Sequence, residues 1–179
     1  MQTEIIVSGF GGQGTLFAGQ LLSYAAMDEG KHVTWIPSYG PEMRGGTANC
    51  TVVIADNEIG SPFVLKPKAV LAMNLPSLDK YEPLIAPGGY LVVNASMVNR
   101  EVQRKDIHVV MIPANEIAHD IGNERAANMV LLGGLLANLP ILPEGALERA
   151  LQAHTSDKMK KFVDINIEAL ARGASYQAT

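Results

Sequence analysis

Apolar residues along the chain gather in six short runs that are rich in β-branched side chains. Runs of this length, bounded by glycine, proline, asparagine or acidic residues, predict buried strands. The six expected strands are Glu4–Ser8, His32–Ile36, Thr47–Ile54, Ala69–Met73, Tyr90–Asn94 and Ile107–Ile112.

Between and after these runs, the apolar residues recur at helical spacing. The expected helices run from Thr15 to a stop at Gly30, then over about Ser77–Ile85, Asn115–Ile121, Asn123–Leu139, Pro143–His154 and Asp157–Arg172. Gly30 stands where a left-handed residue commonly ends a helix. We expect the tail Ala174–Thr179 to be frayed.

Strands alternate with helices first, and helices alone finish the chain. This order predicts one domain over residues 1–179, with a three-layer α/β fold. Its sheet is expected to be doubly wound, mostly parallel and Rossmann-like, and its C-terminal part helical. The first strand–loop–helix–strand unit predicts parallel strands joined by a right-handed crossover.

The composition of the chain excludes several classes of protein and of site. Of 179 residues, 47% are hydrophobic and 18% charged, which excludes a disordered chain. A net charge of −4 argues against non-specific nucleic-acid binding, which needs clustered basic residues. The single cysteine, Cys50, excludes both an intramolecular disulfide and an iron–sulfur cluster held by four cysteines of this chain.

The longest apolar stretch, Ala126–Leu139, is interrupted by Asn128 and Asn138. At a rise of about 1.5 Å per residue it is too short to cross a bilayer. The N-terminus lacks a basic segment ahead of its first apolar run. We therefore expect a cytoplasmic protein with no membrane or nucleic-acid partner.

The first glycine loop follows the first strand and opens the first helix. Its sequence is Gly9-Phe10-Gly11-Gly12-Gln13-Gly14, which matches G-x-G-x-x-G. Glycines permit close backbone approach, and a helix N-terminus attracts anions, so Gly9, Gly11, Gly12, Gln13 and Gly14 are candidate ligand-binding residues.

A dinucleotide site also needs an acid after the second strand, and that strand is followed by Pro37 and Ser38. A P-loop needs lysine after the last glycine, where Thr15 stands. A free-standing dinucleotide enzyme stays open as an alternative, as does a tight turn without any ligand.

The second glycine loop follows the second strand, at the sheet edge where open α/β proteins bind ligands. It consists of Ser38, Tyr39, Gly40, Pro41, Glu42, Met43, Arg44, Gly45 and Gly46. Proline and glycine restrict the backbone, Arg44 offers a planar fork for a carboxylate or phosphate, and Glu42 can orient Arg44. The alternative is a surface loop with a local Glu–Arg pair.

No nucleophile, redox centre or metal site is suggested by the remaining residues. The histidines are scattered, and His119 three residues after Glu116 does not make a metal site. We expect neither a catalytic residue nor a bound metal in this chain.

Three motifs together resemble one family. GFGGQG, SYGPEMRGG and the segment Gly122–Met129 with Asn123 and Asn128 are similar to motifs of the gamma subunit, or gamma domain, of 2-oxoacid:ferredoxin oxidoreductases. The resemblance extends from Ile5 to about Leu170, and the second motif is the most specific.

The resemblance implies an oxidoreductase that converts a 2-oxoacid and coenzyme A into acyl-CoA and carbon dioxide, with reduction of ferredoxin. Thiamine diphosphate, magnesium and iron–sulfur clusters belong to partner subunits of alpha, beta and delta type. We therefore expect this chain alone to bind none of them and not to catalyse. Its two glycine loops, with Asn123 and Asn128, line a subunit junction near the active site or contribute to coenzyme A handling.

Substrate type and assembly complete the expectations. Glu42–Gly46 resembles the 2-oxoglutarate and branched-chain types, and indolepyruvate enzymes carry a similar domain. An isolated subunit exposes apolar surface, so we expect self-association in solution. A pure assembly module, with both loops used only for packing, is the third alternative.

Overall fold

The computed structural model describes residues 1–40 and 45–179. Within this part, six strands form one sheet: β1 (Gln2–Phe10), β2 (His32–Tyr39), β3 (Thr47–Ala55), β4 (Ala69–Ala72), β5 (Tyr90–Asn94) and β6 (His108–Ile112). The helices are α1 (Thr15–Asp28), α2 (Leu75–Tyr81), α3 (Ala114–Asp120), α4 (Ala127–Asn138), α5 (Ala146–His154) and α6 (Val163–Ala174). Short 3-10 turns, η1 (Glu82–Leu84), η2 (Glu124–Ala126) and η3 (Asp157–Phe162), follow α2 or precede α4 and α6.

The sheet is mixed, with strand order β2-β3-β1-β4-β5-β6. β1, β4, β5 and β6 pair in parallel, whereas β3 is antiparallel to both β1 and β2. β1 and β2 therefore run in the same direction, as the sequence predicts, but β3 lies between them. The connection from β2 to β3 is too short for a crossover, so these two strands can pair only as a hairpin.

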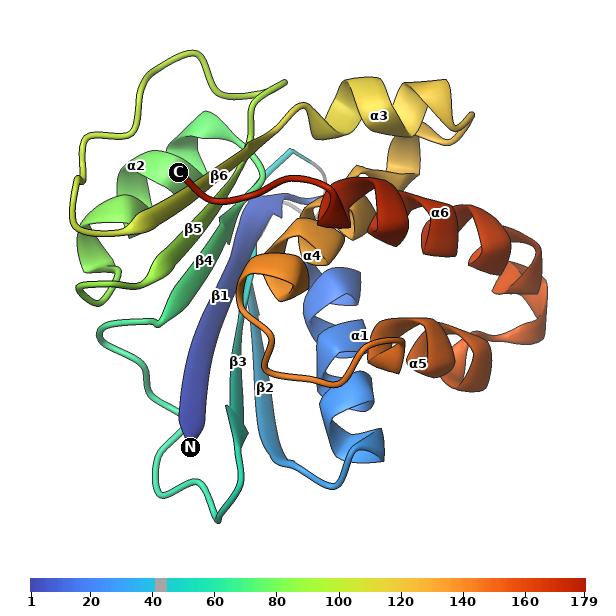
Figure 1. Cartoon of the computed structure of the whole chain (residues 1–179), viewed down its shortest axis with the longest axis horizontal. Helices are drawn as coiled ribbons and strands as arrows, with labels where there is room; N and C mark the ends of the chain where they lie inside the picture. Colours follow the sequence, from blue (N-terminus) through green and yellow to red (C-terminus); the bar gives the residue numbers. More distant parts are fainter. Residues whose placement is uncertain (41–44) are drawn as a thin grey trace.

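Helices cover both faces of the sheet, as Figure 1 shows, with α2 on one side and α1, α4, α5 and α6 on the other. Successive side chains along a strand point to opposite faces, so each strand contributes apolar residues to the cores on both sides of the sheet. Ile5 and Val7 of β1 join the core beneath α1 and α4, and Ile6 between them joins the core beneath α2. The three-layer α/β prediction is confirmed.

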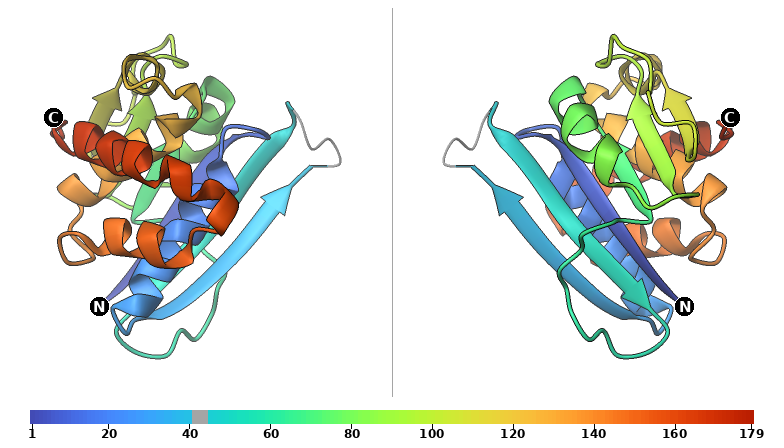
Figure 2. Two further views of the ribbon diagram at one scale, coloured as in Figure 1. Left: turned by 90° about the vertical axis from the view of Figure 1, so that its right-hand side faces the viewer. Right: turned by 90° about the vertical axis from the view of Figure 1, so that its left-hand side faces the viewer.

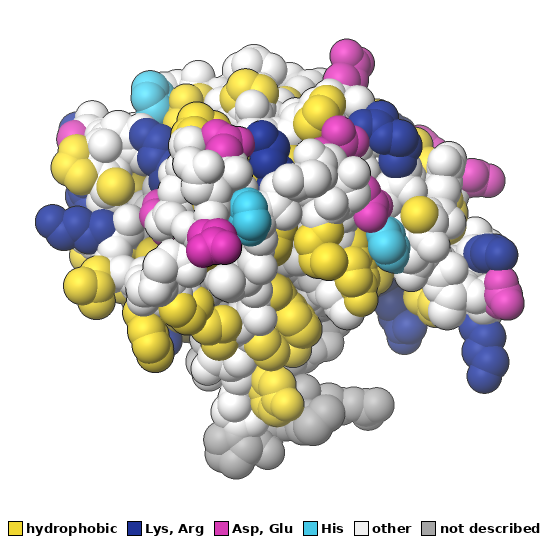
Figure 3. Space-filling view, turned by 90° about the horizontal axis from the view of Figure 1, so that it is seen from below, with side chains coloured by type: hydrophobic (Ala, Val, Ile, Leu, Met, Phe, Trp, Pro, Cys, Tyr) yellow, Lys and Arg dark blue, Asp and Glu magenta, His cyan; other side chains and the backbone are white. Residues whose placement is uncertain are grey.

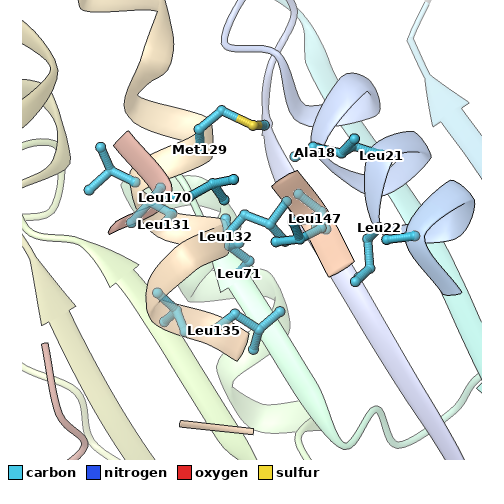
Figure 4. Packing of buried hydrophobic residues seen from close by; sticks show 14 of the residues in the cluster. Ala18, Leu21, Leu22, Leu71, Met129, Leu131, Leu132, Leu135, Leu147 and Leu170 are labelled. Atoms are coloured by element: carbon cyan, nitrogen blue, oxygen red, sulfur yellow. The ribbon is translucent and has the colours of Figure 1, made fainter. Parts of the chain in front are cut away.

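The larger core lies between the sheet and the helices α1, α4 and α5. Leu71 of β4, Leu132 of α4 and Leu147 of α5 meet there (Figure 4), and each is at most 4% exposed. α4 is apolar on nearly every face because α6 covers the side turned away from the sheet. Gly173 of α6 allows this close packing: a Cβ there would lie 1.7 Å from the Val130 carbonyl oxygen.

The strand ends differ from the prediction by up to three residues, most at the end of β2. β2 continues past Ile36 to Tyr39, although Pro37 has no N–H to donate. Proline is tolerated there because β2 is an edge strand, whose outer side needs no partner.

The C-terminal tail is held in place, so the expected fraying is wrong. Asn138 donates from Nδ2 to the Tyr176 carbonyl (2.8 Å) and accepts from the Ala178 N–H at Oδ1 (2.7 Å). The Thr179 N–H donates to the Val109 carbonyl (2.9 Å), which places the tail along the outer edge of β6. The partly buried side chain of Asn138 thus supplies hydrogen-bond partners that a chain terminus usually lacks.

Candidate functional site

The two glycine loops, far apart in the sequence, meet at the end of β1. The Gly11 N–H donates to the Gly46 carbonyl (2.8 Å), and the Gly45 N–H approaches the Gly11 carbonyl (3.4 Å). These contacts extend the β1–β3 ladder, whose last pair is Phe10 with Thr47. Figure 2 shows β2 and β3 side by side as the long ribbon that leads to this meeting point.

A cavity of about 480 Å³ opens where the loops meet. It is lined by Phe10, Gly11, Gly12, Gly14, Thr15, Leu16, Phe17, Tyr39, Thr47 and Ala48. Phe17 of α1 and Tyr39 of β2 are 43% and 62% exposed, so aromatic surface stands open at its mouth. The cavity therefore combines backbone groups and the N-terminus of α1 with an apolar wall.

None of the described residues around this cavity is an acid, a histidine, a lysine, an arginine or a cysteine. The cavity wall in this part of the chain holds no general acid, general base or thiol nucleophile, apart from the phenol of Tyr39. Binding by shape, backbone N–H groups and the helix dipole is the chemistry that these groups can provide.

Gln13 forms two hydrogen bonds within the first glycine loop. Its side-chain Oε1 accepts from the Phe10 N–H (2.7 Å), and its backbone N–H donates to the Phe10 carbonyl (3.1 Å). Gly9 makes room for this amide, since a Cβ at Gly9 would lie 2.7 Å from Oε1. Gln13 thus serves the loop itself instead of facing the cavity.

Asn128 fixes the other end of the first glycine loop. This residue of α4 is 4% exposed, and its Nδ2 donates to the Gly14 carbonyl (3.0 Å). Gly14 has a φ of 75°, which favours glycine, and a Cβ there would lie 2.4 Å from the Asn128 Nδ2. Loop and asparagine therefore fit each other only if position 14 is glycine.

Asn123 lies nearby and begins η2, where its Oδ1 accepts from the Arg125 N–H (3.3 Å). A second cavity, of about 200 Å³, is lined by Gly12, Gly14, Phe17, Asn123, Arg125, Asn128, Met159, Phe162 and Asn166. The fold thus brings the Gly122–Met129 motif against the first glycine loop.

Sequence reasoning missed one member of this site, Asn74. It follows β4, is 1% exposed, and caps α2 by accepting from the Ser77 N–H (3.0 Å). Its Nδ2 also donates to the Gln13 Oε1 (3.1 Å). The signal for it was positional: a polar residue directly after a buried parallel strand, just ahead of a helix beginning with Leu75-Pro76.

The remaining predicted site residues are placed as follows. Ser38 and Tyr39 belong to β2 and are exposed, and Gly40 donates its N–H to the Thr47 carbonyl (3.2 Å). Gly45 has a φ of 78°. Pro41, Glu42, Met43 and Arg44 lie outside the described residues.

Cys50 lies in β3 with its thiol buried between β3 and α1. Burial raises the pKa of this thiol to about 11, and its S–H donates to the Thr15 carbonyl (3.7 Å). The structure thus places Cys50 in the core and not in the cavity.

Two features are absent from residues 1–40 and 45–179. Among these residues, no three His, Cys, Asp or Glu side chains come together as metal ligands would. None of the helices in this part of the chain combines the length and apolar character that a bilayer crossing requires.

Comparison with known proteins gives a family. Residues 4–176 match the family model described as pyruvate ferredoxin/flavodoxin oxidoreductase. The chain is 38% identical to the ketoisovalerate oxidoreductase subunit VorA of Methanothermobacter thermautotrophicus, over 98% of this chain and 36% of VorA. It therefore spans about a third of the length of that relative.

Two further proteins resemble the chain over most of their length. The 2-oxoglutarate synthase subunit KorC of Methanocaldococcus jannaschii is 36% identical, over 84% of this chain and 82% of KorC. The crystal structure of the keto/oxoacid ferredoxin oxidoreductase gamma subunit from Geobacter sulfurreducens superposes with a TM-score of 0.81. That structure is 31% identical and covers 97% of this chain and 96% of its own.

Proposed function

Since the chain belongs to the pyruvate ferredoxin/flavodoxin oxidoreductase family, we propose that it is the gamma subunit of a multisubunit 2-oxoacid:ferredoxin oxidoreductase. In this proposal residues 1–179 act as one gamma-type domain. The assembled enzyme oxidatively decarboxylates a 2-oxoacid with coenzyme A and passes electrons to ferredoxin. The match to KorC over most of both chains favours 2-oxoglutarate, and the match to VorA favours a branched-chain 2-oxoacid.

The observation that carries the proposal is the direct pairing of the two glycine loops through Gly11 and Gly46 (2.8 Å). The pairing turns two motifs into one surface at the carboxyl edge of β1, where open α/β sheets place their ligands. Since the described residues around it supply no acid–base pair, we propose that this surface faces an active site whose chemistry lies elsewhere. Thiamine diphosphate with magnesium and the iron–sulfur clusters then belong to alpha, beta and delta partners.

Exposed apolar side chains support an assembly partner. Phe63 and Leu65, in the segment between β3 and β4, are each 85% exposed, and Ile36 of β2 is 40% exposed. Seen from below, hydrophobic side chains gather over the lower half of the view, with charged ones mostly above and beside them (Figure 3). Grouped apolar surface of this kind usually marks a protein interface. For the isolated chain, the same surface supports self-association.

The sheet order argues against the free-standing dinucleotide enzyme. In a Rossmann site the strand carrying the ribose-binding acid lies next to β1. Here β3 separates β2 from β1, which moves the end of β2 about 4.8 Å farther from the first glycine loop. Calorimetry of the isolated chain with NAD, NADP and FAD tests this; we expect no binding at micromolar concentrations, and such binding would favour the alternative.

Co-expression tests the proposed assembly. The chain is produced with the neighbouring-gene products that carry thiamine diphosphate and iron–sulfur motifs, and the complex is isolated through a tag on this chain. We expect a stable complex that contains each partner. If the tagged chain elutes without any partner although every partner is expressed, the gamma-subunit proposal fails.

Arg44→Ala separates a role near the active site from a role in packing. We propose that the guanidinium group serves the active site of the complex, so the variant should assemble normally and lose most 2-oxoacid-dependent dye reduction. Loss of assembly would instead support the pure assembly module. Arg172→Ala, which removes the same type of side chain from α6, where it is 50% exposed, is the matched control.

The cavity beneath the loops supports a finer proposal, that the chain contributes to coenzyme A binding in the complex. Its volume of about 480 Å³ holds part of such a ligand, and the N-terminus of α1 suits a phosphate. Phe17→Ala should raise the KM for coenzyme A and leave the KM for the 2-oxoacid unchanged. Equal effects on both would point to assembly rather than to coenzyme A.

A further inference from the structure

An unbroken line of hydrogen bonds joins the first glycine loop to helix α2. The Phe10 N–H donates to the Gln13 Oε1 (2.7 Å), and that same oxygen accepts from the Asn74 Nδ2 (3.1 Å). The Asn74 Oδ1 in turn accepts from the Ser77 N–H (3.0 Å). Two side-chain amides thus bridge two backbone donors that lie in different parts of the fold.

The direction of this line is fixed by its two ends. Both terminal groups are backbone N–H groups, which can only donate, so each amide must turn its oxygen toward the nearer backbone group. The Asn74 Nδ2 is then the one donor that the inner amides share. Because Asn74 is 1% exposed, water cannot replace that donor without opening the site.

We propose that Asn74 is a positioning residue, which sets the conformation of the first glycine loop through the amide of Gln13. Asn74 is not among the described residues that line either cavity. It acts by holding the Gln13 amide under Gly9, and this amide holds Phe10, whose next residue pairs with Gly46. The consequence for catalysis rests on the proposed function, whereas the effect on the loop does not.

Asn74→Asp isolates the donor. Aspartate is as good an N-cap as asparagine, so α2 keeps its cap, but a carboxylate replaces the Nδ2 donor. The Gln13 amide must then turn its nitrogen toward the new carboxylate, which leaves the Phe10 N–H without an acceptor. In the isolated chain we expect hydrogen exchange of the Phe10 amide to accelerate about tenfold, while the Ser77 amide stays protected.

Two control variants separate positioning from loss of stability. Ser77→Ala removes the buried hydrogen bond between the Ser77 and Ser8 hydroxyls (2.9 Å) but leaves the amide line intact. Gln13→Glu keeps an acceptor for both Phe10 and Asn74, so Phe10 exchange should stay slow.

In the assembled complex, Asn74→Asp should lower kcat/KM at a temperature where the variant stays folded, and Ser77→Ala should not. The proposal is overturned if Phe10 exchange is unchanged in Asn74→Asp, or if Ser77→Ala accelerates it equally. Accelerated exchange with unchanged turnover would retain the positioning role in the loop and contradict its link to the proposed function. Failure of the wild-type chain to assemble contradicts the proposed function alone.

Discussion

Replacing Gly14 by alanine perturbs the first glycine loop at its contact with α4. Gly14 has a φ of 75°, and the added Cβ would lie 2.4 Å from the Asn128 Nδ2. Alanine therefore meets two costs at once: an unfavourable left-handed backbone, and displacement of a buried amide that donates to the Gly14 carbonyl (3.0 Å).

The size of the effect follows from these contacts. The left-handed conformation costs about 1–2 kcal/mol, and losing the hydrogen bond while leaving the Asn128 amide buried adds about 2–3 kcal/mol. We expect Gly14→Ala to lower the free energy of unfolding by about 3–5 kcal/mol, a large part of the typical total of about 5–15 kcal/mol. Gly12→Ala is the matched control, since Gly12 also has a positive φ (101°) but a Cβ added there would meet no atom within 4 Å.

Urea unfolding of Gly14→Ala, Asn128→Ala and the Gly14→Ala/Asn128→Ala double variant measures the coupling energy between Gly14 and Asn128. Gly12→Ala is unfolded in the same way as the control. Without the Asn128 side chain, Gly14→Ala should cost about 2 kcal/mol less, and the Gly14 carbonyl still accepts from the Ala18 N–H (3.0 Å). The reasoning is refuted if Gly14→Ala costs the same in both backgrounds, or no more than Gly12→Ala.

Three further predictions concern the rest of the fold. Burial raises the pKa of the Cys50 thiol to about 11, so a thiol reagent at pH 8 should label native protein far more slowly than protein in denaturant; equal rates would contradict this. Gly173→Ala brings a Cβ to 1.7 Å from the Val130 carbonyl oxygen and should lower the free energy of unfolding by about 1–3 kcal/mol in urea. An increase, as the higher helix propensity of alanine alone would give, would contradict this prediction. Lys31 and the N-terminal ammonium group hold the pKa of the Asp56 carboxyl down to about 2, so their contribution to stability is present above the usual carboxyl pKa and is lost as the pH falls toward 2. Lys31→Met should raise the Asp56 pKa part of the way in an NMR titration, and an unchanged pKa would refute the pairing.

Local pattern was enough to locate the strands and helices. The predicted strand Tyr90–Asn94 has the same bounds in the structure, because a strand that is buried on both faces of a sheet has a continuous run of apolar residues. The position of β3 was not visible in the same way. Its pairing depends on the short connection after β2 and on backbone contacts between Gly11 and Gly46, neither of which leaves a periodic signal.

The residues of the candidate site also differ in whether the sequence could predict them. Gly14 and Asn128 were predicted from motifs, and the structure adds that one fills the space that the other leaves. Asn74 carried no motif, because its role arises from β4 and α2 packing beside the loop. Asn138, which holds the C-terminal tail, was hidden for a similar reason: its partners lie 38 and 40 residues away.

The most direct test of the central claim is the rate of 2-oxoacid-dependent viologen reduction by the partner subunits, with coenzyme A present, as this chain is added. If the chain completes the enzyme without catalysing by itself, the rate should rise from near zero to a plateau. The chain alone should give no reduction. Full activity of the partners without the chain, or turnover by the chain alone, would contradict the claim.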